Sequence, residues 1–326
     1  MSLSTKNMDA ELAAKLFELM CLIRRFEEES ARLYMLGKIK GFLHLYIGEE
    51  AVAAGAIPPL REDDYIVTHY RDHGHALARG LKPNAIMAEL MGKETGCSGG
   101  KGGSMHLFDT EKGFMGGYAI VGGQMPIATG LALAIKQRGQ DQVVACFFGD
   151  GAVNEGEFHE ALNLAALWKL PVLFFLENNL YGMGTHVERS RAGGKDIFDA
   201  ASAYKIPAKQ INGMDLSEVR ETTIDALNRV RSGDGPVFLE AICYRFRGHS
   251  MADPSAYRKS TEVDEWRDKD PLESFKQTAS QQGLLSAEDV LRISDSVEKT
   301  VKEAIRFGEE SARPPAESLY EHVYAE

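Results

Sequence analysis

Residues 142–179 read QVVACFFGDGAVNEGEFHEALNLAALWKLPVLFFLENN, and this stretch decides the fold. Two short apolar runs, at 142–148 and 171–176, flank a helical segment at 156–170 that is rich in Ala and Leu. Such runs are typical of strands covered on both faces, as in parallel sheets. A strand, a crossover helix and a second strand take about 30 residues. The stretch therefore predicts two neighbouring parallel strands.

The same alternation extends outward along the chain. Further helices are expected at 9–38, after Gly48, at 126–136 and at 215–232, with strands at 65–69 and 235–244. Strand–helix alternation of this kind predicts the α/β class, with a doubly wound, mostly parallel sheet flanked by helices. We expect one domain over residues 1–326, with an N-terminal helical segment at 1–60 and a C-terminal helical segment at 271–326.

A glycine-rich segment, GCSGGKGGSMHLFDTEKGFMGGYAIVGG, occupies residues 96–123. One interpretation is a flexible linker. Large apolar side chains, including Met105, Phe108 and Phe114, are rare in linkers. The glycines instead indicate close backbone approach or positive φ angles.

Composition excludes several classes of protein. Lys and Arg number 37 and Asp and Glu 48, so the net charge is −11. Binding to nucleic acid or to anionic lipid needs a basic surface. The four cysteines are widely spaced, which argues against a disulfide framework or a zinc site. The first residues lack the apolar core of a secretory signal, and no apolar run is long enough to span a bilayer. We expect a cytoplasmic protein, or one of another reducing intracellular compartment.

Polar groups follow three of the predicted strands. They are Gly149-Asp150-Gly151, Glu177-Asn178-Asn179, and the segment after Arg245. Ligands of parallel sheets bind at the carboxyl ends of strands. One carboxylate and one amide oxygen suit Mg²⁺, which completes its shell with phosphate and water. Asp150 and Asn179 therefore predict a magnesium-bound diphosphate. P-loop, dinucleotide, zinc-hydrolase and serine-hydrolase motifs are missing.

The chain resembles the α subunit of the E1 component of 2-oxo acid dehydrogenase complexes. Gly149-Asp150-Gly151, followed after 26 residues by Asn178-Asn179, is similar to the thiamine diphosphate motif. The other matching strings are IRRFEE at 23–28, GFLHLYIGEEA at 41–51, YRDHG at 70–74, GGKGGSMH at 99–106, GDGAVNEGEFHEALNLAALWKLP at 149–171, ENNLYGMGT at 177–185 and YRFRGHSMADPSAYR at 244–258.

The resemblance implies roles for individual residues. Mg²⁺ would be held by Asp150, Asn179 and the carbonyl of Tyr181. The remaining cofactor contacts would come from Tyr70, Arg71, Ala119, Val121, Gly149, Gly151, Ala152, Arg245 and His249. His249 would be catalytic. His73, which follows Tyr70-Arg71 in a polar turn after a strand, is a second catalytic candidate on its position alone. Phe42 and His44 match the family's substrate-side segment, with a purely structural role as the alternative. Many relatives carry Asn-Gly where this chain has Tyr118-Ala119. Because alanine, unlike glycine, disfavours positive φ, the backbone contact at Ala119 requires a negative φ.

The resemblance also implies an activity and partners. The activity is thiamine diphosphate-dependent oxidative decarboxylation of a 2-oxo acid, most similar to the pyruvate type, with acyl transfer to the lipoyl domain of E2. An E1 β subunit would supply the glutamate that activates the cofactor, in an α2β2 heterotetramer. Acetoin-cleaving and branched-chain α subunits remain alternatives, as does a non-catalytic diphosphate-binding module. Ser250 aligns with a serine that is phosphorylated in some relatives, and an ordinary loop serine is the simpler interpretation. We expect loops 186–195 and 248–261 to order around the cofactor.

Overall fold

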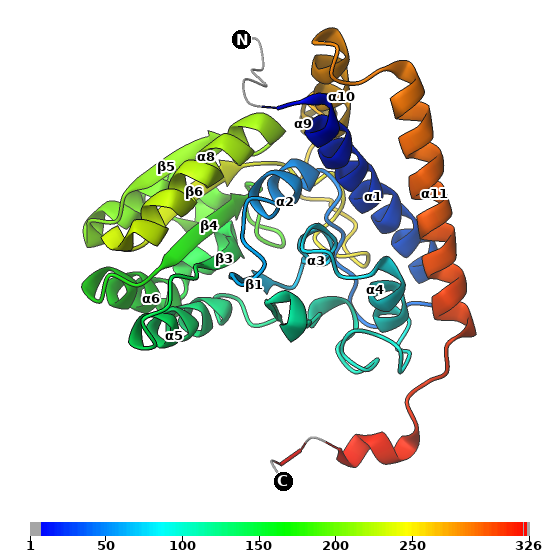
Figure 1. Cartoon of the computed structure of the whole chain (residues 1–326), viewed down its shortest axis with the longest axis horizontal. Coiled ribbons are helices and arrows are strands. Elements are labelled where there is room, and N and C mark those ends of the chain that lie inside the picture. The colour runs from blue at the N-terminus through cyan, green and yellow to red at the C-terminus, as the bar shows by residue number, and fades with distance from the viewer. Residues whose placement is uncertain (1–7, 322, 325–326) are drawn as a thin grey trace.

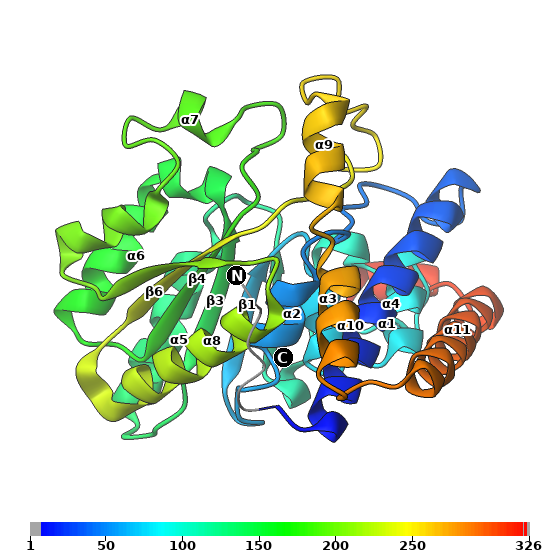
Figure 2. The same cartoon turned by 90° about the horizontal axis from the view of Figure 1, so that it is seen from above.

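A six-stranded parallel sheet forms the centre of the computed structural model, which describes residues 8–321, 323 and 324 (Figures 1 and 2). The strand order is β2-β1-β3-β4-β6-β5. The bounds are β1 (Tyr65–His69), β2 (Phe114–Tyr118), β3 (Val144–Gly149), β4 (Val172–Asn178), β5 (Ala208–Asn212) and β6 (Val237–Ile242). From β1 the chain moves to β2 on one side of it, and the later strands β3 and β4 are added on the other side. The winding direction therefore reverses between β1 and β3. Ligands of open α/β sheets bind at such a reversal.

Helices cover both faces of the sheet and one flank (Figure 1). They are α1 (Ala10–Met35), α2 (Glu50–Ala56), α3 (His73–Ala78), α4 (Pro83–Leu90), α5 (Gln124–Gln137), α6 (Gly156–Leu167), α7 (Val187–Ser190), α8 (Leu216–Arg229), α9 (Ser260–Arg267), α10 (Pro271–Gln281) and α11 (Ala287–Glu310).

Alternate residues of the central strands enter two separate hydrophobic cores. Cys146 and Phe148 of β3 pack with helices α5 and α6. Phe147 of β3 and Phe175 of β4 pack in the other core, which also contains residues of α1, α2 and α8. Burial on both faces explains why the sequence of β3 and β4 is continuously apolar rather than alternating.

The first and last long helices pack together beside the sheet. Helix α1 lies against α11, and α11 also packs on α4 (Figure 1). Asp9 caps α1 by accepting a hydrogen bond from the Leu12 N–H, and Ser286 and Asp289 form a capping box at α11. The assignment of residues 1–326 to one domain stays a prediction.

The expected α/β class and parallel sheet are confirmed, and β1 has the predicted bounds. Two strands were not expected from the sequence, β2 in the glycine-rich segment and β5 at the far edge. Gly116 explains part of that segment: its φ is +107°, and an added Cβ would lie 2.0 Å from the Phe108 ring. The linker interpretation is therefore wrong, and close approach is the reason for glycine here.

All four cysteines are free thiols, as their spacing predicts. None of the helices in the described part of the chain is both long and apolar enough to cross a membrane.

Candidate active site

A cavity of about 310 Å³ lies at the carboxyl ends of β1, β3 and β4, beside the segment that follows β6. Its lining includes most of the residues that the sequence singles out: Tyr70, Arg71, Val121, Gly149, Asp150, Gly151, Ala152, Asn179, Tyr181, Arg245 and His249. Residues up to 179 positions apart in the chain thus meet at one edge of the sheet. This is the edge where the winding direction reverses.

A second cavity of about 520 Å³ adjoins the first and shares Tyr70, Val121, Met183 and His249 with it. Phe42, His44 and Ala119 line this second cavity and not the first. Ala119 is not among the residues with positive φ, so its backbone satisfies the requirement stated for a cofactor contact. Ser250 also lines this cavity and is half-buried.

The predicted oxygen ligands converge inside the first cavity. Asn179 Oδ1 lies 3.4 Å from Arg245 Nη1, and the carbonyl oxygen of Tyr181 lies 3.5 Å from the same atom. Asp150 directly follows the last residue of β3, and its side chain is buried. Burial raises the pKa of the Asp150 carboxyl to about 7, although Arg245 favours the ionised form. A bound cation would remove the main cost of that buried charge.

Glu49, which the sequence analysis did not select, orients Asn179. The Asn179 amide Nδ2 donates to Glu49 Oε1 at 3.0 Å, which leaves Asn179 Oδ1 facing Arg245. Glu49 is buried, and its Oε2 has no hydrogen-bond donor among the described residues. Arg71 Nε is 3.6 Å from that oxygen. The only sequence signal was an acidic pair at 49–50 inside an otherwise apolar helical segment.

Two buried guanidinium groups, those of Arg71 and Arg245, line the cavity. Arg71 donates to the carbonyls of Leu45 and His249, both at 2.9 Å. Burial lowers the pKa of Arg71, and the neighbouring charge of Arg245 lowers it further. Arg245 is 1% exposed and makes only bonds of 3.2–3.5 Å to uncharged groups. No carboxylate of the described residues forms an ion pair with it at 4.0 Å or less. Such a pair of cations suits a diphosphate.

Three aromatic rings meet where the two cavities join. Ring centroids are 4.6 Å apart for His44 and Tyr70, and 5.3 Å apart for His44 and His249. Burial and the charge of Arg71 lower the pKa of His249 to about 3 and that of His44 to about 2. Both rings are therefore neutral near pH 7. The Nδ1 atom of each is buried and has no hydrogen-bond partner among the described residues.

The loop that carries His249 is fixed by Asp253. Its Oδ2 accepts from the His249 backbone N–H at 2.7 Å and from the Tyr257 hydroxyl at 2.5 Å. Arg258 lies 5.3–5.9 Å from the rings of Tyr181, Tyr244 and Tyr257 and holds the loop's far end. These contacts fix the position of His249 relative to the rest of its loop.

His73 lies behind the site rather than in either cavity. Its ring is fully buried, with Nδ1 2.9 Å from Glu27 Oε2 and Nε2 2.9 Å from Ser104 Oγ. Burial by itself would lower the pKa of His73, but Glu27 raises it above the ordinary value. Both nitrogens are occupied, so the geometry gives His73 a supporting position, and a catalytic role for it stays a prediction.

Comparison with known proteins agrees with this geometry. The family model of the dehydrogenase E1 component matches residues 18–317. The chain is 46% identical over 310 residues to the pyruvate dehydrogenase E1 component subunit alpha of Rickettsia bellii, with 95% of each chain covered. It is 45% identical to the protein of the same name from Rhizobium meliloti, covering 95% of this chain and 89% of the relative. For the Zymomonas mobilis protein, the identity is 46% over 97% of this chain and 89% of the relative.

Proposed function

The chain belongs to the dehydrogenase E1 component family, and from this premise we propose that it is the α subunit of a pyruvate dehydrogenase E1 enzyme. The reaction is the oxidative decarboxylation of pyruvate, with transfer of the acetyl group to a lipoyl group on E2. The printed names of the relatives support pyruvate as the substrate.

One observation carries the proposal. Asn179 Oδ1 and the Tyr181 carbonyl both lie within 3.5 Å of one buried atom, Arg245 Nη1, in the cavity that also contains Asp150. Three oxygen ligands and an unpaired cation at the same place suit a Mg²⁺–diphosphate unit, since Mg²⁺ prefers carboxylate, carbonyl and phosphate oxygens.

The lining fits thiamine diphosphate, the cofactor that the family implies. An added Cβ at Gly149 or Gly151 would have no atom within 4 Å, so the backbone after β3 is open to phosphate oxygens. Asp150, Asn179 and the Tyr181 carbonyl would hold Mg²⁺, while Arg71, Arg245 and Tyr70 would bind the diphosphate. When bound, the thiazolium ring acts as the electron sink for decarboxylation.

The chain's own residues bind and orient around that cofactor. The Arg245 guanidinium, whose Nη1 lies within 3.5 Å of the Asn179 and Tyr181 oxygens, would neutralise phosphate charge. His249 and His44, neutral at physiological pH, each offer one N–H donor and one lone pair where the two cavities join. Through these groups a proton can be held or passed near the substrate's carbonyl oxygen. Phe42 and Met183 line the second cavity with apolar surface, which suits a small acyl group.

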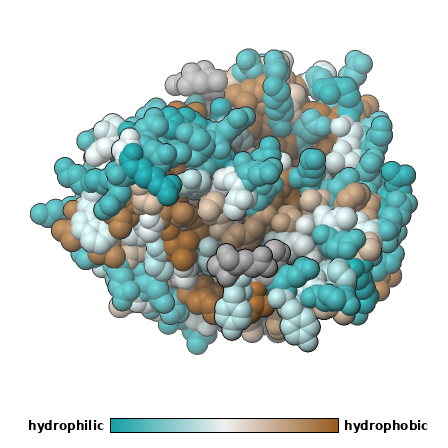
Figure 3. Space-filling model, turned by 60° about the horizontal axis from the view of Figure 1, so that its bottom comes forward, coloured by the Kyte–Doolittle hydropathy of each residue, from teal (hydrophilic) through white to brown (hydrophobic). Residues whose placement is uncertain are grey.

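A β subunit is implied by the family, and we propose that it covers the mouth of the second cavity. Phe42, Val121 and Met183 line that cavity and are 62%, 41% and 68% exposed. Separately, hydrophobic residues gather in the middle of the face drawn in Figure 3, with hydrophilic residues towards its edges. The partner would complete an α2β2 enzyme, supply the carboxylate that activates the cofactor, and exclude water from the reaction.

The test is substrate-driven reduction of an artificial electron acceptor by the chain co-purified with its β partner. Pyruvate, acetoin and a branched 2-oxo acid are compared, with and without thiamine diphosphate and Mg²⁺. We expect turnover of pyruvate that requires both cofactors. A surface variant, His159→Ala, serves as the matched control, because His159 is exposed on α6, contacts Tyr204 and Phe158, and lines neither cavity.

Each result has a defined meaning. Cofactor-dependent turnover of acetoin or of the branched acid, without pyruvate turnover, would reassign the substrate within the family. Tight cofactor binding without turnover of any of the three by an assembled complex would make the chain a diphosphate-binding module.

A further inference from the structure

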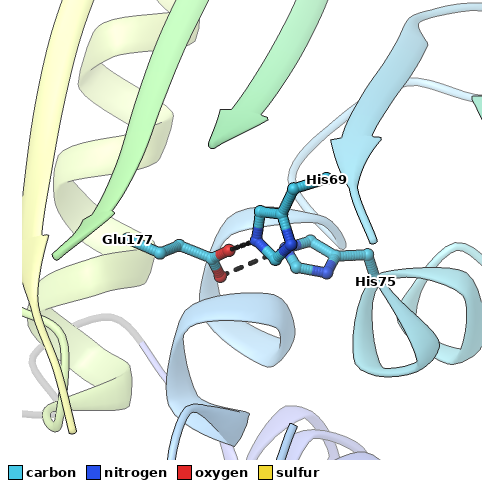
Figure 4. Close-up of side chains that lie close together, drawn as sticks. All are labelled: His69, His75 and Glu177. Atoms are coloured by element: carbon cyan, nitrogen blue, oxygen red, sulfur yellow. Dashed lines mark hydrogen bonds and ion pairs between the residues drawn. The ribbon is translucent and has the colours of Figure 1, made fainter. Parts of the chain in front are cut away.

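A second polar cluster lies at the wall of the cofactor cavity, and the proposed mechanism gives it no role. It consists of His69 at the end of β1, His75 in α3 and Glu177 in β4 (Figure 4). His69 Nε2 is 2.5 Å from Glu177 Oε2, and His75 Nε2 is 3.1 Å from Glu177 Oε1. His75 and Glu177 are at most 1% exposed, and His69 and Glu177 also line the cavity.

By composition the cluster could be a cation site, since its three ligand atoms all lie within 4.8 Å of one another. The proton on His69 argues against this. The Arg71 backbone N–H donates to His69 Nδ1 at 3.0 Å, so Nδ1 is the unprotonated nitrogen. A neutral His69 therefore carries its proton on Nε2 and donates it to Glu177. A histidine that binds a metal through Nε2 usually donates its Nδ1–H to an acceptor, whereas His69 Nδ1 faces the Arg71 N–H, which is itself a donor.

Glu177 is held as a hydrogen-bond acceptor by its other neighbours as well. The Tyr46 hydroxyl donates to Glu177 Oε1, and His75 lies on the same side. Both oxygens of Glu177 therefore face hydrogen-bond donors, with His69 on Oε2 and Tyr46 on Oε1. Hydrogen bonds to an ionised carboxylate are about twice as strong as neutral ones.

The bridge joins two strands that are not neighbours. Strand β3 lies between β1 and β4 and ends in Gly149, which has no side chain to obstruct the crossing. His69 stands two residues before Arg71, and Glu177 stands two residues before Asn179. The two ends of the bridge therefore adjoin the diphosphate-binding turn and the metal-binding strand end of the proposed site.

We propose that His69 is a positioning residue: held between the Arg71 backbone and the Glu177 carboxylate, it keeps the diphosphate-binding turn in place against the metal-binding end of β4 before the cofactor binds. This inference rests on the proposed function, because it assigns His69 a role in that same site. Both ring nitrogens are already bonded, so His69 acts through Arg71 and Glu177 and not on the substrate.

The first test needs no cofactor. Hydrogen–deuterium exchange, resolved to the Arg71 amide, is measured on the cofactor-free complex with its β partner. We expect His69→Ala and His69→Phe to speed exchange of that amide at least tenfold, although Phe keeps the ring volume. His69→Asn, whose side-chain oxygen replaces the Nδ1 acceptor, should restore protection. His159→Ala is the control and should exchange like the wild type.

The second test is calorimetric affinity for thiamine diphosphate with Mg²⁺. Outer-shell partners of a metal site typically contribute 10–100-fold to affinity, so we expect that loss for His69→Ala and His69→Phe. His69→Asn restores only the Arg71 contact and should fall between Ala and the wild type. In the double variant with Glu177→Gln, the two losses should be less than multiplicative, because both remove the same bridge.

Several outcomes would overturn the inference. If His69→Phe matches the wild type in both tests, the ring acts by packing alone. Wild-type affinity in His69→Ala would remove the positioning role while leaving the proposed function intact. Stoichiometric zinc binding by the wild type that His69→Ala abolishes would make the cluster a cation site. A wild-type complex that fails to bind thiamine diphosphate would refute the proposed function and this role together. In that case, exchange of the Arg71 amide in the cofactor-free complex would still show whether the bridge forms.

Discussion

Replacing Asp150 by Asn should stabilise the cofactor-free protein while abolishing magnesium-dependent cofactor binding. Burial of Asp150 raises its pKa from an ordinary 3.8 to about 7 in the folded chain. For an acid whose pKa rises on folding, the folded state binds more protons than the unfolded state. Stability is then greatest below pH 3.8 and falls as the pH rises towards 7.

The magnitude follows from that shift. A difference of about three pKa units corresponds to about 4 kcal/mol of unfolding free energy. The folded protein loses this contribution fully above pH 7. At pH 5 the folded carboxyl is still mostly protonated, and the loss is about 2 kcal/mol. Asn resembles the protonated acid in shape and carries no charge. Its advantage over Asp should therefore grow from about 2 to about 4 kcal/mol between pH 5 and pH 8.

Thermal unfolding in a chelator, at pH 5 and at pH 8, measures the effect. For a chain of this size, about 4 kcal/mol corresponds to an increase in Tm of roughly 5 °C. Asp141→Asn is the matched control: Asp141 is exposed, and its hydrogen bond with Arg61 lowers its pKa, so no gain is expected. Calorimetry with Mg²⁺ and thiamine diphosphate should detect no binding by Asp150→Asn. A variant that is no more stable than the wild type at pH 8, or whose gain is independent of pH, would refute the reasoning.

Three further changes test other parts of the structure. Glu49→Gln removes the charged acceptor that orients Asn179 and should weaken Mg²⁺ affinity about 10–100-fold by calorimetry; an unchanged affinity would mean that Asn179 needs no such support. His249→Asn should lower kcat by about 10²–10⁴, a larger effect than on cofactor affinity, and a change confined to KM would contradict a proton-handling role. Gly116→Ala places an alanine at a backbone φ of +107° and should lower the free energy of unfolding by at least about 1–3 kcal/mol. The control is Gly130→Ala, whose added Cβ has free space in α5. Equal Tm values for these two glycine variants would show that the strand-β2 backbone can relax.

The sequence by itself was sufficient to predict the central strands and the polar residues that follow them. Strands β3 and β4 are buried on both faces, so nearly every residue in them is apolar, and the run is visible without any partner. Parallel strands share one carboxyl edge, so spacing alone brings Asp150 and Asn179 to the same side of the sheet. The edge strands gave no such signal: β5 is only partly buried, and β2 contains two glycines.

Only the tertiary structure decided which polar groups meet each other. Glu49 and Asn179 are 130 residues apart, and His69 and Glu177 are 108 apart. His73 follows Tyr70 and Arg71 closely in sequence, yet the turn into α3 directs its ring away from the cavity and onto Glu27. Sequence patterns report burial and strand direction, which depend on local composition. Hydrogen-bond partners depend on which strands become neighbours and on the direction of each side chain, and these are fixed only when the whole sheet has packed.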